Sequence, residues 1–196
     1  MGKIIGVGPH YQCLLESKGV TLADKPFLFI KPTSSIIKTG STIELPSNVE
    51  KVLAEVEIAI KMKKTVKNIS VEEVTELAVI DGYAICNDVT AIGEDLPSLG
   101  KLYDTFTPIG EFFTIENPSE IKIESYRNGE LQQSATASGM GYSIPYLVSY
   151  ISSLFTLEEG DIILSGTPVG AFEIQKGDTI ELRSPQLGEV NNRVGV

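Results

Sequence analysis

The sequence has no tryptophan and a single histidine, His10, so no second imidazole is available to a functional site. It has only two cysteines, Cys13 and Cys86, and their positions do not match the ligand spacing of a zinc site. Both cysteines lie among apolar residues, a context typical of free thiols buried in a protein of a reducing compartment. A metal site in this chain is therefore not expected to rely on sulfur or imidazole ligands.

Long apolar runs and an excess of positive charge are missing as well. No stretch approaches the roughly 20 apolar residues of a membrane-spanning helix, and the apolar run after Lys3 is too short for a secretory signal. We therefore expect a cytoplasmic protein. With 16 Lys and Arg against 26 Asp and Glu, the formal net charge is -10. Nucleic acids and anionic membranes require basic patches, so neither is expected as a partner.

The composition that remains is that of a globular protein, with 196 residues of which 42% are hydrophobic and 21% charged. Asn128-Gly129 predicts a type I′ hairpin. Ser70 and Glu73 form a capping-box pattern for a short helix that should stop at Asp81-Gly82. Strand patterns, one of them a buried strand at 26–30, dominate over helix patterns. The strand patterns lie at 3–8, 26–30, 42–46, 54–60, 83–87, 122–126, 130–132, 159–164 and 176–182, and the helix patterns at 10–18, 70–79 and 144–155. They predict a mostly β protein with a few short helices (α+β), rolled or sandwiched into one domain.

Two glutamates alternate with apolar residues in one of these strand patterns. Because side chains i and i+2 share one face of a strand, Glu55 and Glu57 should point the same way, while Val56 and Ile58 point into the core. Asp88 follows another strand pattern and adds a third carboxylate. Carboxylates that lie close together repel one another unless a proton or a cation separates them, and oxygen ligands suit Mg²⁺, Mn²⁺ or Ca²⁺. The alternative is that both glutamates form the solvated face of an edge strand.

Several short motifs occur in an order that resembles the fumarylacetoacetate hydrolase family. They are Phe29-Ile30-Lys31-Pro32, Glu55-Val56-Glu57, Asn87-Asp88-Val89-Thr90, Lys101, Asp104-Thr105-Phe106-Thr107-Pro108, Tyr142-Ser143-Ile144-Pro145 leading into Leu157-Glu158-Glu159-Gly160-Asp161, and Gly166-Thr167-Pro168-Val169-Gly170. Each motif is weak alone, and their common order carries the resemblance. It extends from about Gly6 to the C-terminus.

The resemblance implies a mixed β-roll or sandwich of the family's C-terminal-domain type, assembled as a homodimer. It implies one catalytic domain over residues 1–196, in which residues 1–25 form a short N-terminal lid and strand segment. One divalent cation, Mg²⁺ or else Mn²⁺ or Ca²⁺, would bind Glu55, Glu57 and Asp88. Family members act on 2-oxo acids and acylpyruvates by C–C hydrolysis, decarboxylation, tautomerisation or isomerisation. The expected partner is therefore a small-molecule 2-oxo acid, chelated by a metal ion that stabilises its enolate.

Three further residues take roles from the resemblance. Lys101 is the catalytic candidate, which meets developing negative charge or moves a proton, and its alternative is a solvated loop lysine. Thr167 is a substrate-binding candidate through its hydroxyl and backbone N–H, and its alternative is an ordinary turn threonine. Lys31 either contacts the substrate or supports the structure through an ion pair.

The chain departs from the family pattern in its N-terminal lid. Hydrolytic members carry an Asn-Tyr-x-x-His-x-x-Glu motif, in which the histidine and glutamate activate water. Aligned on Gly8-Pro9-His10-Tyr11, the histidine position is Leu14 and the glutamate position is Ser17. Glu16 is one residue out of register, which turns it about a quarter-circle away on a helix. His10, at the asparagine position, is a structural residue or a substitute base.

A second departure follows Asp88. Many members place an arginine there to hold the far carboxylate of the substrate, but this chain has the acidic stretch Ala91-Ile92-Gly93-Glu94-Asp95. Without that bidentate partner, dicarboxylates should bind less well.

Together these departures weigh most against hydrolysis, which needs an activated water, and leave isomerase, tautomerase or decarboxylase chemistry open. The alternative function is a catalytically degenerate homologue that acts as a metal-binding, small-acid-binding or structural dimer.

Overall fold

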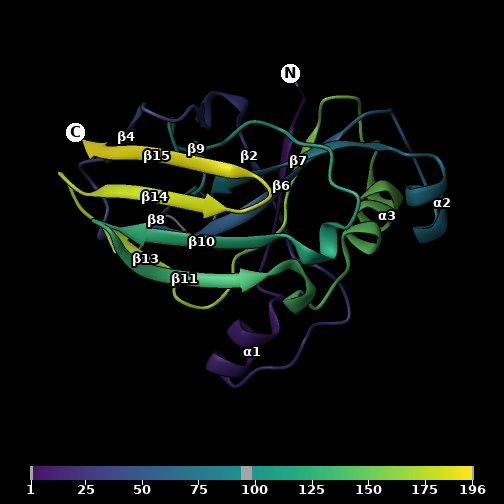
Figure 1. The fold of residues 1–196 in the computed structure, drawn as a ribbon, viewed down its shortest axis with the longest axis horizontal. Helices are drawn as coiled ribbons and strands as arrows, with labels where there is room; N and C mark the ends of the chain where they lie inside the picture. Colours follow the sequence, from purple (N-terminus) through teal and green to yellow (C-terminus); the bar gives the residue numbers. More distant parts are fainter. Residues whose placement is uncertain (1, 94–98, 196) are drawn as a thin grey trace.

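The computed structural model describes residues 2–93 and 99–195, which form a mostly β structure with short helices (Figure 1). Its strands are β1 (Ile4–Val7), β2 (Leu28–Lys31), β3 (Ile36–Ile37), β4 (Thr42–Glu44), β5 (Lys51–Ala54), β6 (Val56–Met62), β7 (Ile80–Asn87), β8 (Thr90–Ile92), β9 (Thr107–Pro108), β10 (Lys122–Arg127), β11 (Glu130–Thr136), β12 (Ile162–Leu164), β13 (Phe172–Ile174), β14 (Thr179–Ser184) and β15 (Gly188–Gly195). Its helices are α1 (Gln12–Lys18), α2 (Val71–Glu76) and α3 (Ile144–Leu154), with 3₁₀ turns at Thr33–Ser35, Pro118–Glu120 and Ala137–Gly139. The predicted fold class is confirmed.

Two large sheets build the body of the protein. One has the strand order β2-β1-β12-β6-β7 and the other the order β11-β10-β14-β15-β4, and smaller sheets β13-β5-β8 and β3-β9 adjoin them. Both large sheets are mixed, because β1 runs parallel to β12 and β15 runs parallel to β4 while their other pairs are antiparallel. Figure 1 shows β10, β11, β14 and β15 stacked in front of β6 and β7, with α2 and α3 side by side at one end and α1 apart from them.

The main core lies between these sheets and follows the period-two alternation of β6. Val56, Ile58 and Ile60 are fully buried in it. The opposite face of β6 is covered as well, because Ala59 belongs to a second, smaller cluster with Ala84 of β7. A strand buried on both faces can bring a polar side chain into the interior only where that side chain finds partners.

Local signals in the sequence account for several element boundaries. Asn128 and Gly129 both have positive φ, 54° and 81°, as the predicted type I′ turn between β10 and β11 requires. Ser70 accepts the backbone N–H of Glu73, and the Glu73 carboxylate accepts the backbone N–H of Ser70, which completes the predicted capping box. None of the described helices is both long and apolar enough to cross a bilayer.

Two local predictions are wrong. The strand at 26–30 is not buried, because β2 is an edge strand: Ile30 on it is 48% exposed, and Phe27, just before it, is 70% exposed. Asp81-Gly82 does not stop the helix: α2 already ends at Glu76, and both residues lie inside β7. Asp81 forms an ion pair with Lys61 of the neighbouring strand, so sheet pairing outweighs the turn preference of this dipeptide.

Close packing of β1 against β2 depends on a glycine. Gly6 pairs with Phe29, and a Cβ added at Gly6 would lie only 2.0 Å from the Phe29 ring. The absence of a side chain at Gly6 therefore lets the ring lie flat over β1, at the position where Phe29 reaches the site described below.

We expect Gly6→Ala to lower the free energy of unfolding by about 1–3 kcal/mol, because the ring must move or the strands must separate. The measurement is urea unfolding followed by circular dichroism. Gly139→Ala is the matched control, since its new Cβ would lie at an ordinary 3.6 Å from the nearest atom, on Tyr11. Equal effects of the two substitutions would contradict this account.

Candidate active site

Glu55 and Glu57 flank the start of β6, where the chain passes out of β5. Glu57 is 2% exposed, and β6 lies between β12 and β7 in the interior of its sheet. The glutamates therefore do not form the solvated face of an edge strand. The Glu57 carboxylate accepts a 2.7 Å hydrogen bond from the backbone N–H of Gly166. Glu55 is tied to Asp88 through the backbone, since the Asp88 N–H donates to the Glu55 carbonyl at 2.8 Å.

Lys101 joins two of the three carboxylates directly. Its ammonium group donates to the carboxylates of Glu55, at 2.9 Å, and of Asp88, and to the Thr90 hydroxyl at 2.6 Å. The Thr90 hydroxyl in turn donates to Glu55 at 2.8 Å. Because an ammonium has three N–H donors, Lys101 is fully engaged, and it lies 4.6 Å from the centre of the Phe29 ring. Lys101 is not a solvated loop lysine.

Lys31 holds the opposite side of Asp88. Its ammonium is fully buried and donates to the Asp88 carboxylate at 2.5 Å and to the carbonyls of Val89 and Phe106 at 3.1 and 2.9 Å. All three of its donors are used within the protein, so none is left for a substrate. The geometry supports the ion-pair alternative for Lys31 rather than substrate contact.

These side chains border an inner cavity of about 470 Å³. Glu55, Glu57 and Asp88 line it together with Lys101 and Thr167, so the predicted catalytic and metal-ligating residues share one space. The remaining walls are formed by Val7, Gly8, Pro9, Leu14, Lys18, Phe27, Phe29, Leu53, Thr90, Ile92, Gly170 and Ala171. Lys31 is not among the lining residues, in keeping with its place behind Asp88.

Charge balance explains the ionisation of the cluster. Burial pushes the pKa of Asp88 upward, but the ammonium groups of Lys31 and Lys101 outweigh it and hold the pKa below its usual value. Burial, with the charges of Asp88 and Glu55, raises the pKa of Glu57 well above its usual value. Burial lowers the pKa of Lys101, yet the carboxylates around it outweigh that effect and raise it. Two ammonium groups thus balance Glu55 and Asp88, and Glu57 is the carboxylate without a compensating charge.

The donor set fits a hard divalent cation in its chemistry, since it consists of carboxylate oxygens only. However, the structure brings no three His, Cys, Asp or Glu side chains of residues 2–93 and 99–195 close enough together to hold a metal ion. Lys101 stands between Glu55 and Asp88, and Glu57 turns toward Gly166. A divalent ion would take over the charge that the Lys101 ammonium now supplies and would also compensate Glu57.

Thr167 is tied to the glutamate strand by a residue that the sequence did not single out, Gln133 of β11. The Gln133 amide donates to the Thr167 hydroxyl and the Pro168 carbonyl at 2.9 and 3.0 Å, and accepts the Val56 N–H at 2.9 Å. The Thr167 hydroxyl donates to the Val56 carbonyl at 3.0 Å. A lone glutamine in a strand pattern carries no signal of burial, because such residues usually face solvent.

The lid positions contribute no acid–base pair. His10 is fully buried: its Nδ1 accepts the Tyr142 N–H at 3.3 Å and its Nε2 donates to the Ser165 carbonyl at 2.5 Å. Burial lowers the pKa of His10, so it stays neutral and serves as a structural link. Leu14 borders the cavity, whereas Glu16 is exposed and does not line it. Of the predicted acidic stretch, Glu94 and Asp95 lie outside the described residues.

Fold and site together define a class of enzymes with a carboxylate-rich cavity in a mixed β structure. The chain belongs to the fumarylacetoacetate hydrolase family: the family described as fumarylacetoacetate (FAA) hydrolase C-terminal matches residues 3–195. It is 37% identical over 193 residues to the mitochondrial oxaloacetate tautomerase FAHD2 of Oryza sativa subsp. japonica, covering 91% of this chain and 84% of the relative.

Two solved structures have the same fold as this chain. A 5-carboxymethyl-2-hydroxymuconate delta-isomerase from Mycobacterium smegmatis superposes with a TM-score of 0.89 at 32% identity, covering 99% of this chain and 78% of the other. Fumarylpyruvate hydrolase from Pseudomonas aeruginosa, solved in complex with Mn²⁺ and pyruvate, gives a TM-score of 0.89 at 26% identity, covering 99% and 89%. This chain is an enzyme of the same hydrolase and isomerase family.

We expect Glu57→Gln to change how the stability of the metal-free protein depends on pH. Because the pKa of Glu57 is raised by folding, the native state holds a proton that the unfolded state releases above about pH 4.3. The contribution of Glu57 to stability therefore falls as pH rises from there through the raised pKa. In urea unfolding with EDTA between pH 5 and 8, the free energy of unfolding of Glu57→Gln should increase relative to that of the wild type as pH rises. Glu130→Gln, at an exposed position, should follow the wild-type profile.

Gln133→Leu should lower the free energy of unfolding by about 1–3 kcal/mol, because it leaves the buried Val56 N–H without an acceptor. Gln132→Leu is the matched control, since the Gln132 amide donates only to the Glu130 carbonyl. Both variants are compared with the wild type by chemical unfolding. A loss no greater than that of the control would show that the Gln133 amide does not hold the two segments together.

Proposed function

We propose that the chain is a divalent-metal-dependent enzyme that acts on a 2-oxo acid by stabilising its enolate, with keto–enol tautomerisation as the reaction that its residues suit best. The observation that carries this proposal is that Glu55, Glu57, Asp88 and Lys101 line one cavity. Two relatives, from Oryza sativa subsp. japonica and Homo sapiens, are 37% and 34% identical over 193 and 189 aligned residues and are named oxaloacetate tautomerases.

Glu55, Glu57 and Asp88 would hold the metal ion, for which we propose Mg²⁺, with Mn²⁺ or Ca²⁺ as substitutes. When bound, such an ion polarises the oxygens of a 2-oxo acid and stabilises the negative charge that develops when a C–H or C–C bond beside the carbonyl breaks. The Mn²⁺ and pyruvate in fumarylpyruvate hydrolase of Pseudomonas aeruginosa support this assignment.

The chain's own residues would divide the remaining work. Despite burial, the carboxylates around Lys101 raise its pKa and keep it protonated. A metal ion on Glu55 and Asp88 would release the Lys101 ammonium, which would then meet the negative charge of the developing enolate or move a proton. Lys31 fixes the orientation of Asp88 from behind. At Thr167 the hydroxyl hydrogen is already donated to Val56, so a substrate carboxylate would be met by the Thr167 backbone N–H, for which the described residues contain no other acceptor.

Tautomerisation is favoured over hydrolysis because the lid offers no group to activate water. His10 uses both ring nitrogens in structural hydrogen bonds, and Leu14 faces the cavity where hydrolytic members carry histidine. Leu14 and Lys18 of α1 border the cavity, which supports the expectation that residues 1–25 form a lid segment of a single catalytic domain over 1–196. Isomerisation and decarboxylation would also need Lys101 to meet negative charge or move a proton, so both remain open as reactions.

The family resemblance also supports a homodimer, and the excess of acidic residues supports the absence of nucleic-acid and membrane partners. Light scattering of the purified protein would give the oligomeric state. Cytoplasmic location remains a prediction: Cys13 and Cys86 are free thiols, while the plant and human relatives are named as mitochondrial.

With Mg²⁺ or Mn²⁺, the wild-type protein should accelerate the keto–enol interconversion of oxaloacetate, followed by ultraviolet absorbance, and EDTA should abolish the effect. Asp88→Asn should reduce the rate by about 100-fold or more, because it removes a metal ligand and the partner of two ammonium groups. Asp81→Asn, which removes a carboxylate from a surface ion pair, is the control and should keep the wild-type rate. Metal-dependent binding of oxalate, an enolate mimic, gives a readout independent of turnover. Failure of both oxalate and oxaloacetate to respond to the metal would overturn the proposal.

A further inference from the structure

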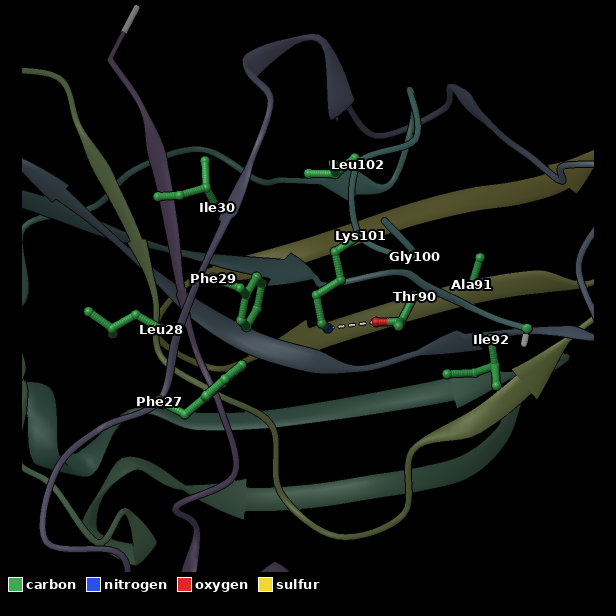
Figure 2. Close-up of a pocket in the computed structure, with 11 residues that line it drawn as sticks. Phe27, Leu28, Phe29, Ile30, Thr90, Ala91, Ile92, Gly100, Lys101 and Leu102 are labelled. Atoms are coloured by element: carbon green, nitrogen blue, oxygen red, sulfur yellow. Dashed lines mark hydrogen bonds between the residues drawn. The ribbon is translucent and has the colours of Figure 1, made fainter. Parts of the chain in front are cut away.

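A second cavity, of about 510 Å³, lies beside the carboxylate-lined one. Its walls are mainly apolar and come from β2 with the residue before it, from β8 with the residue after it, and from residues 100–102 (Figure 2). The lining residues are Phe27, Leu28, Phe29, Ile30, Thr90, Ala91, Ile92, Gly93, Gly100, Lys101 and Leu102. We call this space the outer cavity.

The outer cavity and the inner cavity are neighbours that share part of their walls. Phe27, Phe29, Thr90, Ile92 and Lys101 line both of them. Figure 2 shows the Phe29 ring beside the Lys101 side chain, whose ammonium is directed to Thr90. A ligand whose one end is anchored at the carboxylates would therefore pass Lys101 and Phe29 and place its other end in the outer cavity.

In the part of the chain that the structure describes, the outer cavity offers no cation directed at a second negative charge. Lys101 is the only charged residue among the described residues that line it, and its ammonium is directed to Glu55, Asp88 and Thr90, at the anchoring end of the site. The sequence between Thr90 and Lys101 contains no lysine, arginine or histidine. Moving a carboxylate out of water without a compensating donor is unfavourable, whereas burial of an apolar group is favourable.

We propose that the outer cavity binds the distal part of the substrate and selects an apolar alkyl or aryl group there rather than a second carboxylate. This inference rests on the proposed function, because it assumes that the 2-oxo acid end is anchored in the inner cavity. It places monocarboxylic 2-oxo acids with an apolar tail above dicarboxylic ones, so oxaloacetate is expected to be a weaker substrate of the reaction proposed above. The exposed apolar side chains of Phe27, which precedes β2, and of Ile30 in β2 are then part of the wall of a binding site.

The test is calorimetric titration of the Mn²⁺-loaded protein with a series of 2-oxo acids, which measures binding without turnover. Lengthening the chain from pyruvate through 2-oxobutanoate to 2-oxohexanoate should lower Kd by about fourfold for each added methylene. The sharpest comparison is 2-oxoglutarate against 5-methyl-2-oxohexanoate, in which an isopropyl group replaces the far carboxylate. We expect the isopropyl compound to bind at least about tenfold tighter.

Leu102→Arg places a cation in the outer cavity and should reverse this preference, with 2-oxoglutarate then binding tighter than its isopropyl counterpart. Leu102 is 41% exposed, so the substitution does not disturb the core. Leu154→Arg on α3, at a residue that is 53% exposed and remote from both cavities, is the matched control and should keep the wild-type preference.

The outcomes distinguish a failure of this inference from a failure of the proposed function. If pyruvate binds only with the metal but longer tails bring no gain, or if wild type prefers 2-oxoglutarate, the outer cavity does not select apolar tails while the proposed function stands. An unchanged preference in Leu102→Arg would likewise overturn the assignment to this cavity. If neither pyruvate nor oxalate binds in the presence of Mn²⁺, the proposed function fails and this inference fails with it.

Discussion

A buried aspartate held between two lysine ammonium groups is the interaction on which the site depends. Asp88 has no contact with solvent, and Lys31 and Lys101 approach its two oxygens from opposite sides. A carboxylate at such depth would be protonated without these cations. The two lysines differ in what surrounds them. Lys31 is enclosed by backbone carbonyls and supports the fold, whereas Lys101 faces the cavity, where we propose its catalytic role.

This arrangement connects the architecture of the sheets to the ionisation of the site. Glu57 occupies the interior of a central strand, and the two ammonium groups are already matched by Glu55 and Asp88. The remaining carboxylate, Glu57, is left with a raised pKa, and a bound divalent cation would supply the positive charge that its ionised form lacks. An acidic protein with a net charge of -10 can hold an anionic substrate only where its own cations, or a bound one, reverse the local field.

The two proposals place the chemistry and the substrate selectivity of the site in different parts of the structure. Carboxylates and Lys101 line the inner cavity, while the outer cavity is lined mainly by side chains of an edge strand and of β8. Phe29 belongs to both, and it reaches this place because Gly6 on the neighbouring strand has no side chain. Family members can thus share the anchoring end of the site and differ in what the outer cavity accepts, because the two sets of residues come from different segments.

Period-two alternation, turn chemistry and capping are local, so the sequence by itself determined the mostly β class, the Asn128-Gly129 hairpin, the α2 start and the inward direction of Val56 and Ile58. The order of the motifs determined the family, and with it the candidates Glu55, Glu57, Asp88 and Lys101. Only the tertiary structure decided that β6 is a central strand, that Lys31 supports Asp88 and that Gln133 joins Thr167 to Val56. The exposure of β2 and the shared wall of the two cavities were decided there as well. Those features depend on contacts between segments far apart in the chain, and a local pattern carries no information about which partner a side chain meets.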